Sequence, residues 1–262
     1  MDERLIGCRS FSERRILLLV AGCVFNLDAD SPQYPPHLIY ADNKIVLPTL
    51  QSRSRIIDLE LGQKINVACL GAGNSLQATG RAINEAACGA GSKLIVNSVA
   101  FSYQQLGCRT KNKVVLVENS TCVDGAGARV DVGWQFGAEF IRLYDVCHNK
   151  AGAFNYYVNS DLVAASVGAD DKNHKRPSFS TGGYYPNLAV NDLYSQVQQQ
   201  KTIAGILGSD NLGYFDINGQ VFLSRGHLAP DGDFIDADSQ DGSYYFINAA
   251  PQWQIFNAGS WL

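Results

Sequence analysis

The residues best suited to chemistry lie near the end of the sequence, around His227. This histidine follows Arg225 at the end of a short apolar run, and two asparagines, Asn248 and Asn257, come further along the chain. Imidazole can act as a general base near neutral pH, and an amide oxygen is a hard, neutral ligand suited to Mg²⁺. The Arg225 guanidinium offers a planar fork for phosphate oxygens. Together these groups indicate metal-assisted hydrolysis of phosphodiester bonds.

The pattern of apolar and polar runs predicts the elements that must position these groups. An apolar run at residues 221–223 predicts a strand that leads to His227, and a polar loop follows it. A second apolar run, Tyr244 to Ile247, predicts another strand, and Asn257 then lies at the beginning of a helix. The expected order is therefore strand, loop, strand and helix.

The motifs in this region resemble those of a known family. The segments Ser224 to His227 (SRGH), Asn248 to Gln252 (NAAPQ) and Asn257 to Trp261 (NAGSW) resemble the D-R-G-H, N-x-x-P-Q and N-x-G-x-W motifs of the DNA/RNA non-specific endonuclease family, in the ββα-metal superfamily. The segment Arg176 to Pro186 (RPSFSTGGYYP) is similar to the secreted invertebrate branch, which includes double-stranded ribonucleases and digestive or salivary deoxyribonucleases.

The resemblance implies a role for each residue. His227 would deprotonate the attacking water, Arg225 would help to hold the motif or the phosphate, and Asn248 would orient the site. Asn257 would be the direct protein ligand of a hydrated Mg²⁺ or another hard divalent cation such as Mn²⁺. Arg176 would match an upstream phosphate-binding arginine. Contacts to backbone phosphates of DNA and/or RNA imply little sequence selectivity.

The fold implied by the resemblance is α+β. It is a ββα-metal nuclease fold with a central, mostly antiparallel twisted sheet flanked by helices, incomplete at the C-terminus. Ser224 stands where the family usually has aspartate, and the chain ends at Leu262, inside the expected metal-binding helix. We therefore expect a truncated form, because a short isolated helix is marginal and would hold Asn257 poorly. The alternative function is a catalytically inactive nuclease-fold protein that binds nucleic acid or another partner.

The earlier part of the chain is predicted to be β-rich. Apolar runs separated by Gly, Asn and Asp clusters predict a largely antiparallel sheet. The expected strands are 65–70, 93–101, 113–117, 130–136, 140–146 and 154–158. The predicted domains are a β-rich region at 30–160 and a nuclease domain at 161–262, preceded by a signal peptide at 1–29.

Two helices are predicted outside the motif region. The first covers Ser75 to Ala87, although the glycine within it costs roughly 1 kcal/mol relative to alanine. The second covers Asn191 to Leu207, with Asn191 as its N-cap, an apolar stripe along one face and Gly208 as its C-terminal stop. A hairpin turn is expected at Asn218 and Gly219.

Other polar groups are interpreted mainly as structural or solvent-exposed. His37 has no ligand partner near it in the sequence, and no catalytic role is expected for it. The aspartates at 231–241 do not match a calcium loop, because Asp241 stands where glycine is required, so turn-forming and solvation roles are favoured. The basic cluster at 172–176 could steer phosphates or form a solvated loop, with His174 exposed.

Composition and the N-terminus indicate export. The 262 residues are 46% hydrophobic, and the net charge of −4 gives no sign of general affinity for polyanions. An arginine pair precedes the apolar run at 16–25, which predicts a signal peptide cleaved after Ala29. A lipoprotein box ending at Cys23 and an N-terminal core element are the alternatives. Extracellular localisation without stable membrane association follows from the first interpretation, and oligomeric state is left open.

The cysteines support the same interpretation. Removal of residues 1–29 leaves five of the seven cysteines, with no CxxC pair, so disulfides are favoured over a zinc cluster. An odd number predicts one unpaired thiol. A mitochondrial nuclease of the same superfamily is a third possibility, against which disulfides would count.

Overall fold

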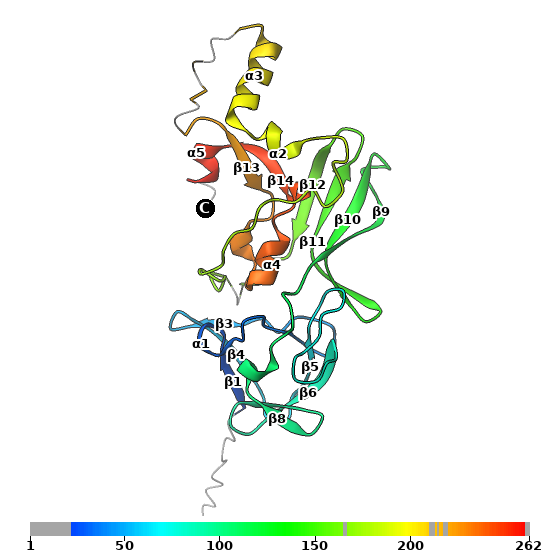
Figure 1. Cartoon of the computed structure of the whole chain (residues 1–262), viewed down its shortest axis with the longest axis vertical. Helices are drawn as coiled ribbons and strands as arrows, with labels where there is room; N and C mark the ends of the chain where they lie inside the picture. The colour runs from blue at the N-terminus through cyan, green and yellow to red at the C-terminus, as the bar shows by residue number, and fades with distance from the viewer. Residues whose placement is uncertain (1–21, 165–166, 210–212, 214, 217–219, 260–262) are drawn as a thin grey trace, which may run out of the picture.

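A computed structural model describes residues 22–164, 167–209, 213, 215–216 and 220–259. The molecule is elongated, with the first strands at one end and the later sheet, α3 (Gln196–Leu207) and the C-terminal elements toward the other (Figure 1). The α+β class is confirmed, and the named strands pair antiparallel. Within the described residues the strands form four separate sheets rather than one central sheet. No helix in this part of the chain is long and apolar enough to cross a membrane.

The N-terminal body contains two small sheets around one core. The three-stranded sheet has the order β1 (Cys23–Asn26), β4 (Ser54–Leu59), β3 (Thr49–Gln51). The five-stranded sheet has the order β2 (His37–Ile39), β5 (Lys64–Ala68), β6 (Ile83–Gly89), β7 (Lys93–Val96), β8 (Val99–Phe101). The short helices of this body are α1 (Leu27–Asp30) and η1 (Tyr103–Leu106). Leu59, Val67 and Leu94 are among the fully buried side chains of its core.

The helix predicted over Ser75 to Ala87 is wrong. Strand β6 occupies the second half of that range, where buried Asn84 and Ala86 alternate with exposed Glu85. This period of two is that of a strand with one face buried. Gly80 has a φ of 70°, a left-handed conformation that a helix interior does not accommodate.

Residues that were assigned to the leader belong to the folded body. Strand β1 pairs with β4, and Cys23 forms a disulfide with Cys88. Cleavage after Ala29 would remove Cys23 from this disulfide, so that cleavage site conflicts with the structure, and Cys23 is not free for a lipoprotein anchor. The core-element interpretation holds for β1, whose Cys23 and Phe25 side chains are buried in the core.

Three disulfides occur among the described residues, and the expected unpaired thiol is not found there. Besides Cys23–Cys88, the pairs are Cys69–Cys108 and Cys122–Cys147. The sequence predicted an odd number of cysteines because Cys23 was counted as part of the cleaved leader.

The second body is built on a four-stranded sheet. Its order is β12 (Phe154–Ser160), β11 (Glu139–Asn149), β10 (Gly127–Phe136), β9 (Val115–Cys122). Val132 and Tyr144 of this sheet share a core with Tyr185, Phe246 and Ile247. The predicted division at residue 160 therefore cuts through one hydrophobic core. A third cluster, which includes Leu70 of the first body and Trp134 of β10, joins the two bodies.

The second predicted helix is divided into α2 (Val190–Leu193) and α3. Ser195 caps α3 by accepting a hydrogen bond from a backbone N–H, whereas Asn191 lies inside α2. Gly208 ends α3 in the left-handed conformation, as predicted. The predicted apolar stripe is exposed, with Val197 69% accessible. Instead Gln199 is buried and bonds both backbone groups of Leu223. The turn expected at 218–219 lies outside the described residues.

The predicted order of strand, loop, strand and helix is present near the C-terminus. Strand β13 (Leu223–His227) pairs antiparallel with β14 (Ala249–Trp253), and α5 (Gln254–Asn257) follows directly. The connection contains η3 (Asp231–Asp233), α4 (Ala237–Gly242) and η4 (Phe246–Asn248). The second strand thus begins after the apolar run that was expected to form it.

Candidate active site

His227 lies at the end of β13 in a half-buried, aromatic environment. Its ring centroid lies 5.0 Å from that of Phe179 and 4.7 Å from that of Tyr244, the latter edge-on. Burial lowers the pKa of His227 below its ordinary value of 6.5, the Asp231 carboxylate opposes this shift, and the Arg176 cation adds to it. The imidazole is therefore neutral at pH 7, which is the form that can accept a proton.

The Asp231 carboxylate joins Tyr244, whose ring contacts His227, to the Arg176 cation. Tyr244 donates its hydroxyl to Asp231 Oδ2 at 2.8 Å, and Arg176 Nε lies 3.1 Å from the same oxygen. The Arg176 side chain is 69% exposed, so its guanidinium remains accessible to a phosphate. The sequence motifs identified neither Asp231 nor Tyr244. The only available signal was the position of Asp231 in the polar loop after His227.

Arg225 lies two residues before His227 on β13, so both side chains are on one face of the hairpin. Its guanidinium lies 5.4 Å from the ring centroid of Tyr194 and 5.8 Å from that of Phe246. Arg225 Nη2 also donates to Asn191 Oδ1 at 3.3 Å. These contacts fix the guanidinium against α2 and η4.

Asn248 is fully buried and holds the loop that follows His227. Its Oδ1 accepts a hydrogen bond from the Ala229 N–H at 2.8 Å, and its Nδ2 donates to the carbonyls of Ala229 at 2.9 Å and Ser243 at 3.0 Å. With its amide used in this way, Asn248 holds the backbone of the loop that follows His227.

Asn257 is half buried at the end of α5, which contacts β13. No hydrogen bond of its side chain is seen among the described residues. A single neutral amide oxygen suits Mg²⁺, which keeps most of its waters and takes one or two protein ligands. The donor chemistry of Asn257 therefore fits a hydrated hard cation.

Ser224, at the position usually occupied by aspartate, uses its hydroxyl inside the hairpin. Ser224 Oγ donates to the Gln252 carbonyl on β14 at 3.0 Å. Two residues further along β13, a Cβ added at Gly226 would lie only 2.3 Å from Gln252 Oε1. A side chain at position 226 would therefore collide with Gln252, so the SRGH segment needs its glycine for close pairing of the two strands.

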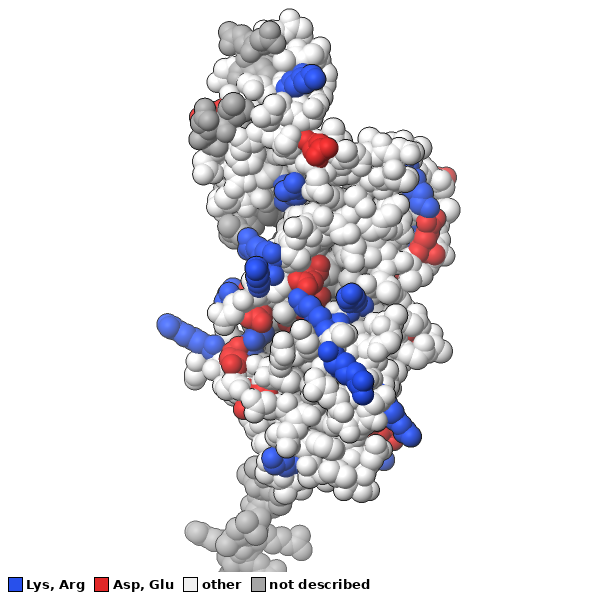
Figure 2. All heavy atoms as spheres, in the orientation of Figure 1, with Lys and Arg blue, Asp and Glu red and all other residues white. Residues whose placement is uncertain are grey.

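The basic cluster at 172–176 is largely paired with acidic groups. Lys172 Nζ lies 2.7 Å from Asp170, and His174 Nε2 lies 2.9 Å from Asp241. The His174 side chain is only 4% exposed, so the expectation that it is solvated is wrong. Figure 2 shows Lys and Arg side chains gathered around acidic ones across the middle of this face. Any attraction for phosphates is therefore local.

Comparison with known proteins identifies the class. The family model described as DNA/RNA non-specific endonuclease matches residues 128–262, just over half of the chain. The chain therefore belongs to the DNA/RNA non-specific endonuclease family. The match begins within β10, which agrees with a core shared by the four-stranded sheet and the ββα elements.

Two relatives resemble nearly the whole chain. The protein is 26% identical to "Salivary endonuclease" of Lutzomyia longipalpis over 87% of this chain and 51% of that protein. It is 19% identical to "Salivary protein Tsal2A" of Glossina morsitans morsitans over 98% of this chain and 65% of that protein. The chain thus spans between half and two thirds of the length of these relatives. No solved structure matches it.

Proposed function

We propose that this chain hydrolyses phosphodiester bonds of DNA and/or RNA without sequence preference. The observation that carries the proposal is His227, a neutral imidazole at the end of β13, with the Asp231 carboxylate and the Arg176 cation beside it. Membership of a nuclease family and similarity to a protein named as a salivary endonuclease support the same activity.

In this proposal His227 accepts the proton of the attacking water. Its lowered pKa keeps it unprotonated at neutral pH, and the ring contact with Tyr244 limits its orientation. Arg176, with its exposed guanidinium, binds a phosphate oxygen of the substrate, and Arg225 holds β13 in place or reaches the phosphate. Asn248 keeps the loop after His227 fixed.

Asn257 is proposed as the protein ligand of a hydrated Mg²⁺ or Mn²⁺. When bound, such a cation supplies positive charge that stabilises the transition state and the leaving 3′ oxygen. Asn257 would hold it through one amide oxygen from α5, on the element that follows the two strands of the motif.

We also propose that the protein acts outside the cell. The three disulfides form and persist in oxidising compartments, and both relatives carry the word salivary in their names. The disulfides count against a mitochondrial nuclease. A leader, if present, would have to end before Cys23, because Cys23 is bonded to Cys88.

The test is cleavage of supercoiled plasmid and double-stranded RNA with added Mg²⁺ and, separately, with chelator. We expect cleavage that needs the cation and falls strongly in Asn257→Ala. The Lys201→Ala variant is the control, because the Lys201 side chain is exposed on α3 and forms no hydrogen bond or ion pair with the described residues. Retardation of nucleic acid in a gel without any cleavage would contradict the proposed nuclease activity. It would favour the alternative, a catalytically inactive protein that binds nucleic acid.

A further inference from the structure

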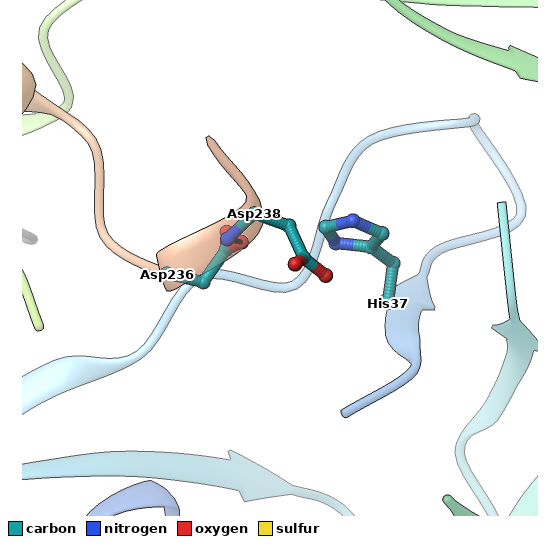
Figure 3. Close-up of side chains that lie close together, drawn as sticks. All are labelled: His37, Asp236 and Asp238. Carbon is teal, nitrogen blue, oxygen red and sulfur yellow. Dashed lines mark hydrogen bonds between the residues drawn. The ribbon is translucent and has the colours of Figure 1, made fainter. Parts of the chain in front are cut away.

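His37 faces two aspartates that are distant from it in sequence. Figure 3 shows its imidazole, on strand β2, directed toward the carboxylate of Asp238 at the beginning of α4, with Asp236 beside it. One ligand atom from each of the three residues lies within 4.8 Å of the others. The sequence around His37 gave no sign of these neighbours, because both aspartates are about 200 residues away in the chain.

His37 and Asp238 are buried and Asp236 is partly buried, and the three residues include no Lys or Arg. His37 is 6% exposed and Asp238 is 7% exposed, and the His37 ring packs 4.5 Å from the ring of Trp134. His37 Nε2 is buried without a hydrogen-bond partner. Two neighbouring carboxylates repel each other in a poorly solvated place, and a bound cation would remove that cost.

The aspartates are held in place by hydrogen bonds that leave lone pairs available. Asp236 is the N-cap of α4: its Oδ1 accepts from the N–H groups of Asp238 at 3.0 Å and Ser239 at 2.9 Å, and its Oδ2 accepts from Ser239 Oγ at 2.5 Å, which leaves a lone pair on Oδ2. Asp238 Oδ2 accepts from Asn112 Nδ2 at 2.7 Å, and Asn112 Oδ1 accepts from the Leu70 N–H at 2.6 Å. Partners of this kind orient the ligands of metal sites.

We propose that His37, Asp236 and Asp238 form a binding site for a divalent transition-metal ion, foremost Zn²⁺. One imidazole nitrogen and two carboxylate oxygens suit Zn²⁺ or Mn²⁺, whereas Mg²⁺ and Ca²⁺ prefer oxygen ligands alone. In a four-coordinate zinc site the ligand atoms are about 3.3 Å apart. Because the three ligand atoms here lie within 4.8 Å of one another, zinc binding needs each distance to shorten by about 1.5 Å or less.

The surroundings provide room for this contraction and for a fourth ligand. A cavity of about 300 Å³ lies against all three residues and is also lined by Arg55 and Tyr103. A water molecule in the cavity would complete the coordination of Zn²⁺. Since β2 belongs to the N-terminal body and α4 lies between the strands of the ββα motif, the ion would tie the two bodies together. The site shares no residue with the candidate active site and does not depend on the proposed nuclease activity.

The test measures zinc binding by the full chain after treatment with chelator and dialysis. We expect the chain to retain one Zn²⁺ in equilibrium dialysis and to unfold at a higher temperature as zinc concentration rises. His37→Gln and Asp238→Asn should each weaken binding at least about tenfold, because each removes a ligand. The exposed Asp42 provides the control variant Asp42→Asn, which should bind as the unchanged chain does.

Histidine-selective NMR of the unchanged chain keeps the proposal testable if a variant fails to fold. Of the four imidazoles, one should shift on addition of one equivalent of Zn²⁺, and the same signal should respond in His227→Ala. Zinc binding that survives both site variants, absence of zinc binding, or loss of the zinc-responsive signal in His227→Ala would each overturn the proposal. None of these outcomes concerns nuclease activity, so the two proposals fail separately.

Discussion

The environment of His227 sets the pH at which it can act as a base. Because burial lowers its pKa below 6.5, the imidazole stays unprotonated to a lower pH than a solvated histidine. Cleavage should therefore be lost only as the pH falls through this lowered pKa. We expect the acidic limb of the kcat/KM profile below pH 6.5, and a limb above that value would contradict the assignment.

The two charges beside His227 should shift this limb in opposite directions. Arg176 disfavours the imidazolium, so Arg176→Gln should raise the pKa of His227 and move the limb to higher pH. Asp231 favours the imidazolium, so Asp231→Asn should move the limb to lower pH. Both profiles are read as kcat/KM, whose midpoint does not depend on how much activity remains. Shifts in the same direction would show that the base lies elsewhere.

Residue types alone predicted part of this site. The SRGH segment indicated His227 and Arg225 because a base and a phosphate ligand are recognisable from chemistry and order. Asp231 and Tyr244 were not predicted, because loop folding brings them to the histidine. The proximity of His37 to Asp236 and Asp238 was not predicted for the same reason, since the two aspartates lie about 200 residues away in the chain.

Asn248 is the residue on which the loop between the two strands depends. Replacement by alanine leaves the buried N–H of Ala229 and two carbonyls without their partner. We expect Asn248→Ala to lower the free energy of unfolding by about 2–3 kcal/mol, measured by denaturant titration. The matched variant Asn257→Ala, at a half-buried position, should lower it by less than about 1 kcal/mol. Equal losses would contradict the positioning role of Asn248.

At the scale of elements, periodicity predicted strands better than helices. The runs at 130–136 and 140–146 form β10 and β11, whose apolar side chains are buried in two separate clusters. The run at 75–87 misled because its small and apolar residues also fit a helical spacing, and pairing with β5 decided the outcome. The C-terminal end of α3 at Leu207 was predicted correctly, but tertiary packing rather than propensity determines which face is buried.

The molecule as a whole joins two β-rich bodies, and the N-terminal one includes Cys23. Loss of the Cys23–Cys88 disulfide through Cys23→Ser with Cys88→Ser should lower the free energy of unfolding by about 4 kcal/mol. The Cys122–Cys147 disulfide closes a shorter loop, so its removal by Cys122→Ser with Cys147→Ser should lower the free energy of unfolding by about 3.5 kcal/mol. Thermal and denaturant unfolding measure both. A mature chain that begins at Asp30 and is as stable as one that keeps Cys23 would contradict this architecture.

Domain division could not be predicted from composition alone. The predicted boundary at 160 followed the point to which the family resemblance reached back, and one core holds Val132 and Tyr144 together with Phe246 across that position. Contacts between residues far apart in the chain define a core, and no local pattern records them. The same holds for Leu70 and Trp134, which connect the two bodies.

The assignment of His227 as the general base is tested most directly by removing its imidazole and supplying imidazole from solution. Cleavage of plasmid under single-turnover conditions should slow by about 10²–10⁴-fold in His227→Ala and recover in part with added imidazole, in proportion to its unprotonated fraction. The control is Asn257→Ala, which imidazole should not rescue. Cleavage by His227→Ala at the rate of the unchanged chain would contradict the assignment.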